Sequence, residues 1–96
     1  MVFEVTYNEL RIEPTLAATR ELFKYNKDLT DVLEILTNGY ECGSSTRKPN
    51  IIERCMRKND KEFKVVIARC QIKYPDSFVE TVWRLVHFGK VSFKER

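Results

Sequence analysis

His87 is the only histidine in the chain, and histidine is the side chain best suited to proton transfer near neutral pH. Cleavage of RNA without a metal needs such a group, a second acid or base, and cations beside the phosphate. Glu53 is a carboxylate that stands among arginines, so His87 and Glu53 are the candidate catalytic residues. The competing interpretation is structural, because strand alternation would put His87 on the face of Trp83 and Leu85, half-buried in the core.

Basic residues concentrate in the second half of the chain. Residues 47–96 contain thirteen Lys and Arg against six Asp and Glu, whereas residues 1–46 contain four against eight. Such asymmetry indicates an anionic partner, although a solvated basic surface is the commoner explanation of any single cluster. Arginine binds phosphate through two hydrogen bonds, and tyrosine can stack on a base. The candidate nucleic-acid-binding residues are Arg47, Lys48, Arg54, Arg57, Lys58 and Tyr40.

The three cysteines, Cys42, Cys55 and Cys70, are odd in number and widely spaced. This pattern favours free thiols over a disulfide framework. With His87 they could supply four zinc ligands, but structural zinc sites usually show short paired spacings, and the sequence has none. We therefore expect cysteines packed in the core, no metal and no cofactor.

The N-terminal half predicts one strand followed by two helices. Residues 2–8 alternate apolar and polar side chains, the pattern of a half-buried strand. Thr15 is placed to cap the first helix, and Asp28 or Thr30 to cap the second. Asn38-Gly39 would end the second helix, because glycine adopts the left-handed conformation at no steric cost. The inward face of the first helix would comprise Leu16, Ala18, Leu22, Phe23 and Tyr25.

The C-terminal half predicts three strands. Two β-prone runs, residues 50–58 and 62–72, flank a polar turn, which indicates a hairpin. Residues 77–88 fit either a helix or a strand, and we favour a strand over about 79–88, since β-branched residues crowd a helix. The predicted order is β-α-α-β-β-β. This is an α+β fold with a single antiparallel sheet and the helical pair on one face.

The length of 96 residues suffices for one domain with a two-layer core, so residues 1–96 are taken as a single domain. A hydrophobic fraction of 43% is ordinary for a globular chain, and no apolar run reaches the ~20 residues that cross a bilayer. The N-terminus has acidic residues where a signal peptide would have a basic start and an apolar block. These features predict a cytoplasmic protein without a membrane partner.

The order of elements and the stretch Leu16–Tyr40 resemble a widespread prokaryotic domain family related to the RelE and BrnT toxin ribonucleases. In that family the first helix opens with a His-Ala-x-x-Arg pattern, and the second carries an Asp-Val step before a closing Asn-Gly. Arg20, Asp31-Val32 and Asn38-Gly39 match this pattern, and Leu16 stands where the family has histidine. The resemblance in layout covers nearly the whole chain.

The resemblance implies RNA binding through the basic hairpin and metal-independent endoribonuclease activity. It also implies an antitoxin partner, because relatives of this kind are commonly held by a protein that covers the basic face. The alternative function is a non-catalytic interaction module, bound by an antitoxin or self-associating, for example as a sheet-edge homodimer. An enzyme requires His87 or a carboxylate exposed among arginines, whereas a binding module needs only cations and aromatic side chains.

Overall fold

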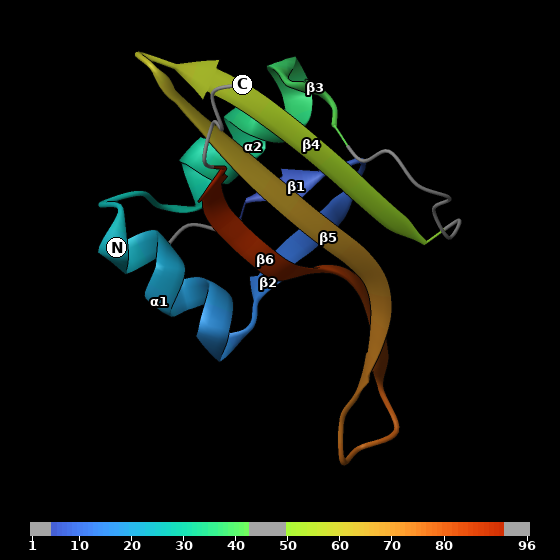
Figure 1. The fold of residues 1–96 in the computed structure, drawn as a ribbon. Helices are drawn as coiled ribbons and strands as arrows, with labels where there is room; N and C mark the ends of the chain where they lie inside the picture. Colours follow the sequence, from blue (N-terminus) through green and yellow to red (C-terminus); the bar gives the residue numbers. More distant parts are fainter. Residues whose placement is uncertain (1–4, 43–49, 92–96) are drawn as a thin grey trace.

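The computed structural model describes residues 5–42 and 50–91 of the chain (Figure 1). The described strands form one sheet in the order β1-β2-β6-β5-β4-β3, with the long strands β5 and β6 in the middle. Along the sequence the elements are β1 (Thr6–Tyr7), β2 (Leu10–Pro14), α1 (Leu16–Lys24), α2 (Leu29–Asn38), β3 (Tyr40–Glu41), β4 (Ile51–Lys58), β5 (Lys61–Lys73) and β6 (Val79–Val91).

The sheet is mixed. β2 runs parallel to β6, from Ile12 opposite Trp83 to Pro14 opposite Leu85. The other neighbouring pairs among the described strands are antiparallel. The prediction of a single antiparallel sheet in the order β-α-α-β-β-β is therefore wrong.

The error lies in the N-terminal segment, which folds as a hairpin and not as one strand. Asn8 and Glu9, with φ of 50° and 70°, form a two-residue turn between β1 and β2. This reversal places β2 beside β6 and gives the pair its parallel direction. β2 then leads directly into α1, and the amide of Thr15 donates to the carbonyl of Leu85 at 3.1 Å.

Both helices pack on one face of the sheet around a single apolar core. Thr15 caps α1 as predicted, because its hydroxyl oxygen accepts from the amide of Ala18 at 3.1 Å. The buried stripe runs through positions 18, 22 and 25, so Leu16 and Phe23 fall on the far side and are 67% and 87% exposed. Their predicted inward placement is wrong. The core comprises Val5, Ile12, Ala18, Leu22, Val32, Ile35, Leu36, Phe63, Val65, Ile67, Trp83, Leu85 and Phe88.

α2 begins with a capping box. The Asp28 carboxylate accepts from the amides of Thr30 and Asp31, and the Asp31 carboxylate accepts from the amide of Asp28. The Thr30 hydroxyl also donates to the Asp28 carboxylate. This bond is the main cause that lowers the pKa of Asp28, and the amide bonds lower it further. Neither α1 nor α2 has the length and hydropathy of a bilayer-crossing helix, and the described residues contain no other α-helix.

Gly39 ends α2, but for a different reason from the one predicted. Its φ is −82°, which is not the left-handed conformation. A Cβ at this position would lie 2.4 Å from the carbonyl oxygen of Cys55 and 2.5 Å from that of Ile35. Glycine is therefore required by the close approach of the helix end to β4.

A β-bulge in β6 changes the side-chain alternation at His87. The pairing with β5 skips Val86, which is the extra residue of the bulge. Leu85 faces the core as alternation predicts, but the next core residue is Phe88, and His87 is exposed. The interpretation of His87 as a half-buried structural histidine therefore does not hold.

The C-terminal strands otherwise follow the prediction. β4 and β5 form a hairpin around the turn Asn59-Asp60, and the ambiguous segment 79–88 lies within strand β6. β4 pairs with β5 only as far as Ala68, so the last part of the β5–β6 hairpin has no strand beside it in the part of the chain that the structure describes. Residues 71–81, here called the arm, project from the sheet and end in a turn at Tyr74–Phe78 (Figure 1).

Candidate nucleic-acid interface

The two faces of the sheet divide the predicted arginines. Residues directly opposite each other on adjacent antiparallel strands share a face. Arg54 lies opposite the core residue Val65, so it stands on the face that the helices cover, and its Nε atom is buried without a hydrogen-bond partner among the described residues. Arg57 lies opposite Glu62, on the other face, here called the open face. Arg47 and Lys48 lie outside the described residues.

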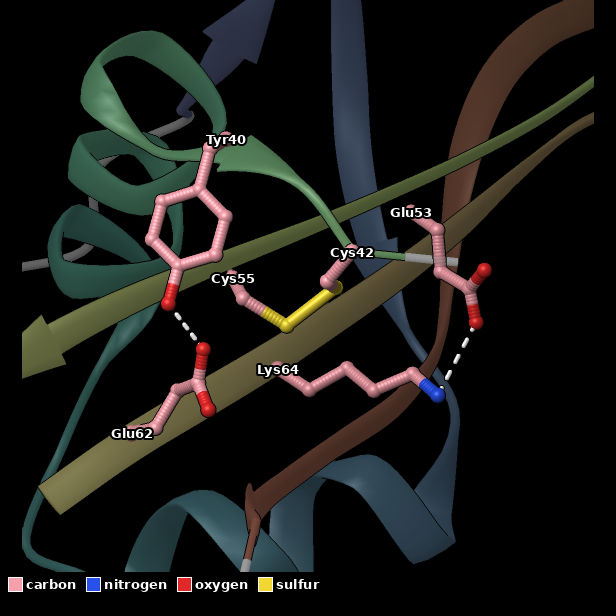
Figure 2. Close-up of a disulfide and its surroundings, with 6 residues drawn as sticks. All are labelled: Tyr40, Cys42, Glu53, Cys55, Glu62 and Lys64. Carbon is pink, nitrogen blue, oxygen red and sulfur yellow. Dashed lines mark hydrogen bonds and ion pairs between the residues drawn. A yellow bond between two sulfur atoms is a disulfide. The ribbon is translucent and has the colours of Figure 1, made fainter. Parts of the chain in front are cut away.

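Two candidate residues on the open face are held by neighbouring side chains (Figure 2). The Tyr40 hydroxyl donates to the carboxylate of Glu62, and this bond raises the pKa of Tyr40. The Glu53 carboxylate lies 3.0 Å from the ammonium nitrogen of Lys64. Tyr40 and Glu53 are therefore positioned by contacts within the protein.

A disulfide between Cys42 and Cys55 lies between these two contacts (Figure 2). Only Cys70 is a free thiol in the described chain, so the prediction of free thiols is wrong for the other two cysteines. Strand β3, which the sequence did not predict, brings Tyr40 opposite Cys55 and so sets the Cα atoms of the two cysteines 5.7 Å apart. Disulfides persist mainly in oxidising compartments, and the cytoplasmic location stays a prediction.

The two candidate catalytic residues lie in one row across the open face. Glu53 is opposite Val66 on β5, and Val66 is opposite His87 on β6. Adjacent strands are ~4.8 Å apart, so the two residues are separated by roughly 10 Å. This distance exceeds hydrogen-bond reach, and the structure does not bring Glu53 and His87 into contact.

His87 instead lines a hollow of about 340 Å³ between α1 and β6. Glu21 and Tyr25 line it from α1, and Lys90 lines it from β6. The imidazole lies over Gly89, since a Cβ at that position would be 3.0 Å from its Nε2 atom. Gly89 lies opposite Lys64 on the open face, so the imidazole stands on that face, whereas Glu21 and Lys90 line the hollow from the covered face.

A second hollow, of about 360 Å³, adjoins the first and shares Tyr25 and Lys90 with it. It lies at the β4–β5 turn and is here called the lysine pocket. The rings of Tyr25 and Phe63 meet edge to face at 5.7 Å, and Lys27 Nζ lies 5.2 Å from the centre of the Phe63 ring. The lysine pocket is lined by Tyr25, Lys27, Lys58, Asn59, Lys61, Phe63 and Lys90.

The lysine pocket gathers positive charge from four separate segments. Lys58 is partly neutralised, because its ammonium nitrogen lies 3.3 Å from the carboxylate of Glu34 on α2. Lys61 and Lys90 are exposed and form no ion pair within residues 5–42 and 50–91. Sequence reasoning placed Lys58 in the basic set but missed Lys27, which stands alone in a short connection between the helices and gains its lysine neighbours only on folding.

Among residues 5–42 and 50–91, no group of three or more His, Cys, Asp or Glu side chains is placed to hold a metal ion. Comparison of the chain with protein-family models, curated proteins and solved structures finds no match.

Proposed function

We propose that the protein binds single-stranded RNA and that the lysine pocket holds the phosphate backbone. The observation that carries the proposal is the convergence of Lys27, Lys58, Lys61 and Lys90 on one hollow. Lysine ammonium groups bind phosphate oxygens, and each phosphate they neutralise releases a counterion. The resemblance of the helical segment to the RelE and BrnT families favours RNA over other polyanions.

The aromatic side chains support the same proposal. Tyr25 is half-buried beside the lysines, so part of its ring is open to a base, and bases of single-stranded RNA stack on such rings. Phe63 is only 5% exposed, and its ring positions Lys27 through the contact with the Lys27 ammonium group. The open face is less suited to phosphate, because Lys64 is paired with Glu53 and Arg11 with Glu80.

The test compares lysines of the pocket with Lys73, which lies at the other end of β5, roughly 40 Å from Lys61. Lys61→Gln and Lys90→Gln remove exposed charges from the lysine pocket, and Lys73→Gln removes an exposed charge from the arm. Binding of a labelled single-stranded RNA pool is measured over a series of salt concentrations. We expect each pocket variant to reduce the slope of log affinity against log salt by roughly one unit, and Lys73→Gln to leave it unchanged.

Equal losses for Lys61→Gln and Lys73→Gln would mean that binding depends on net charge and not on the pocket. A DNA pool of the same sequences completes the experiment, because tighter binding of RNA is expected if the 2′-hydroxyl is recognised. Absence of RNA binding by the unaltered protein would favour the alternative, an interaction module bound by a protein partner or by a second copy.

Endoribonuclease activity is a second candidate, favoured by the connection between the two hollows. Because Tyr25 and Lys90 line both, an RNA strand held by the lysines would pass Glu21. In this reaction Glu21 accepts the proton of the 2′-hydroxyl, whose oxygen attacks phosphorus. The leaving 5′-oxygen takes a proton from water, and the products are a 2′,3′-cyclic phosphate and a 5′-hydroxyl.

A further inference from the structure

We propose that a third hollow, at the base of the arm, binds a guanine base. This arm hollow has a volume of about 590 Å³, within the range of roughly 300–1,000 Å³ that small-molecule sites occupy. It shares no residue with the lysine pocket, so the proposal goes beyond RNA binding and does not depend on it. Its polar lining consists of Asn8, Glu9, Asn50, Arg69, Gln71 and Thr81.

The polar side chains of the arm hollow are available to a ligand. Within residues 5–42 and 50–91, none of the six makes a side-chain hydrogen bond or an ion pair. Elsewhere on the sheet, Arg11 and Lys64 each hold a glutamate at 3.0 Å. Because the Glu9 carboxylate and the Arg69 guanidinium line one hollow without pairing, each group can form hydrogen bonds with a ligand.

The backbone around the arm hollow is well defined. Asn8 and Glu9 belong to the β1–β2 turn, and the indole nitrogen of Trp83 donates to the carbonyl of Tyr7 beside that turn at 2.9 Å. On the opposite side, the amide of Arg69 donates to the carbonyl of Asn50 at 2.8 Å. The side chains of Glu9 and Arg69 therefore project from segments that are held in place by other contacts.

The charges indicate the class of ligand. A phosphate group suits the arm hollow poorly, because Glu9 offsets the charge of Arg69. Guanine presents two adjacent acceptors, O6 and N7, on one edge and two adjacent donors, N1–H and the N2 amine, on another. Arginine binds O6 and N7 through two hydrogen bonds, and a carboxylate can accept both donors. Guanine is the one common RNA base with both edges, so it fits Arg69 and Glu9 together.

The experiment uses nucleosides, which lack a phosphate and so do not test the lysine pocket. Guanosine, inosine, 7-deazaguanosine and adenosine are titrated into the unaltered protein, and binding is followed by changes in the amide NMR spectrum. Inosine lacks the N2 amine that faces Glu9, and 7-deazaguanosine lacks the N7 acceptor that faces Arg69. We expect guanosine to bind at least roughly tenfold more tightly than each of the other three. Equal affinity for guanosine and adenosine, or no binding of guanosine, would overturn the proposal.

Two variants assign the contacts. Glu9→Gln should abolish the preference for guanosine over inosine, and Arg69→Gln should abolish the preference over 7-deazaguanosine. Both positions are exposed, so neither change is expected to affect folding, and Arg20→Gln on the exposed side of α1 is the matched control. A guanosine preference that survives both variants would also overturn the proposal.

A final pair of ligands tests whether the guanine that binds the arm hollow belongs to RNA or to a free nucleoside or nucleotide. An oligonucleotide with one guanine among adenines is compared with an all-adenine oligonucleotide, using the Lys61→Gln variant to weaken backbone binding. A guanine-dependent gain beyond the affinity for free guanosine assigns the arm hollow to RNA, and no gain assigns it to a free guanine nucleoside or nucleotide. Failure of the RNA experiment on the lysine pocket leaves the nucleoside result unaffected.

Discussion

Arg11 and Glu80, which are 69 positions apart in sequence, are joined by two hydrogen bonds of 3.0 Å between the guanidinium and the carboxylate. The hydroxyl of Tyr74 donates to the same carboxylate at 2.8 Å. Glu80 thereby fixes the arm to β2, because Arg11 stands on β2 while Tyr74 stands at the arm's turn. Paired hydrogen bonds between arginine and carboxylate are among the stronger polar contacts in proteins.

We expect Glu80→Gln to lower stability in a pH-dependent manner. The pKa of Glu80 is lowered by the hydrogen bond from Arg11 and then by that from Tyr74. A carboxyl group whose pKa is lower in the folded chain stabilises the fold above its unfolded pKa, and this contribution is lost as the pH falls through the folded pKa. The difference in free energy of unfolding should be full at neutral pH and should decline below about pH 4.3. Urea unfolding at several pH values measures it, and a difference independent of pH would contradict the expectation.

Reduction of the disulfide should destabilise the protein. Cys42 and Cys55 are separated by 13 positions, and a cross-link of about this length stabilises a fold by roughly 3 kcal/mol. We expect a loss of this size when dithiothreitol is added before urea unfolding. The variant Cys42→Ser should show the same loss without reductant and no further loss with it. Cys70→Ser is the control, since it keeps the disulfide and should retain full sensitivity to reductant.

Gly39→Ala should destabilise the protein by about 1–3 kcal/mol, because the new methyl group would contact two backbone oxygens that cannot move independently. Gly89→Ala provides the comparison. There the methyl group would lie 3.0 Å from the flexible imidazole of His87, so a smaller loss is expected. Thermal unfolding of both variants measures the difference. Equal losses of stability would show that the contact with backbone oxygens is not what makes glycine necessary at position 39.

The catalytic carboxylate can be identified by comparing two variants. If the protein cleaves RNA in the presence of EDTA, Glu21→Gln should lower the rate by roughly 10²-fold or more, because Glu21 lines the hollow that adjoins the lysine pocket. Glu53→Gln should leave the rate nearly unchanged, since Val66 separates Glu53 from His87 and the Glu53 carboxylate is paired with Lys64. His87→Asn tests the predicted proton-transfer residue, whose imidazole stands on the same face as Glu53. A larger loss of rate with Glu53→Gln than with Glu21→Gln would identify Glu53 as the catalytic carboxylate.

The elements that the sequence predicted correctly are those with a strong local signal. Thr15 and Asp28 cap helices where expected, and Asn59-Asp60 forms the expected hairpin turn. The β1–β2 turn has the same geometry but went unrecognised, because Asn8 and Glu9 interrupt only a short run of apolar residues. With that turn missed, the parallel pairing of β2 and β6 could not be predicted.

The candidate site was harder to predict, since it depends on which face each strand residue occupies. Strand alternation puts neighbours such as Glu53 and Arg54 on opposite faces, but only the register shows that Arg54 is the one on the covered face. Alternation failed at His87, because a bulge leaves no clear mark in sequence. The lysine pocket joins residues from four segments, and Lys27 belongs to no basic cluster in the sequence.

The parallel pairing of β2 with β6 has a consequence for the time at which the chain can fold. Both helices and strands β3 to β5 lie between these two partners in sequence. During synthesis on the ribosome, β2 can therefore pair only with β1 until β6 has emerged, and the core residue Ile12 lacks its β6 neighbour until then. Such long-range contacts give a high contact order, so the last step of folding is expected to be the docking of the N-terminal hairpin.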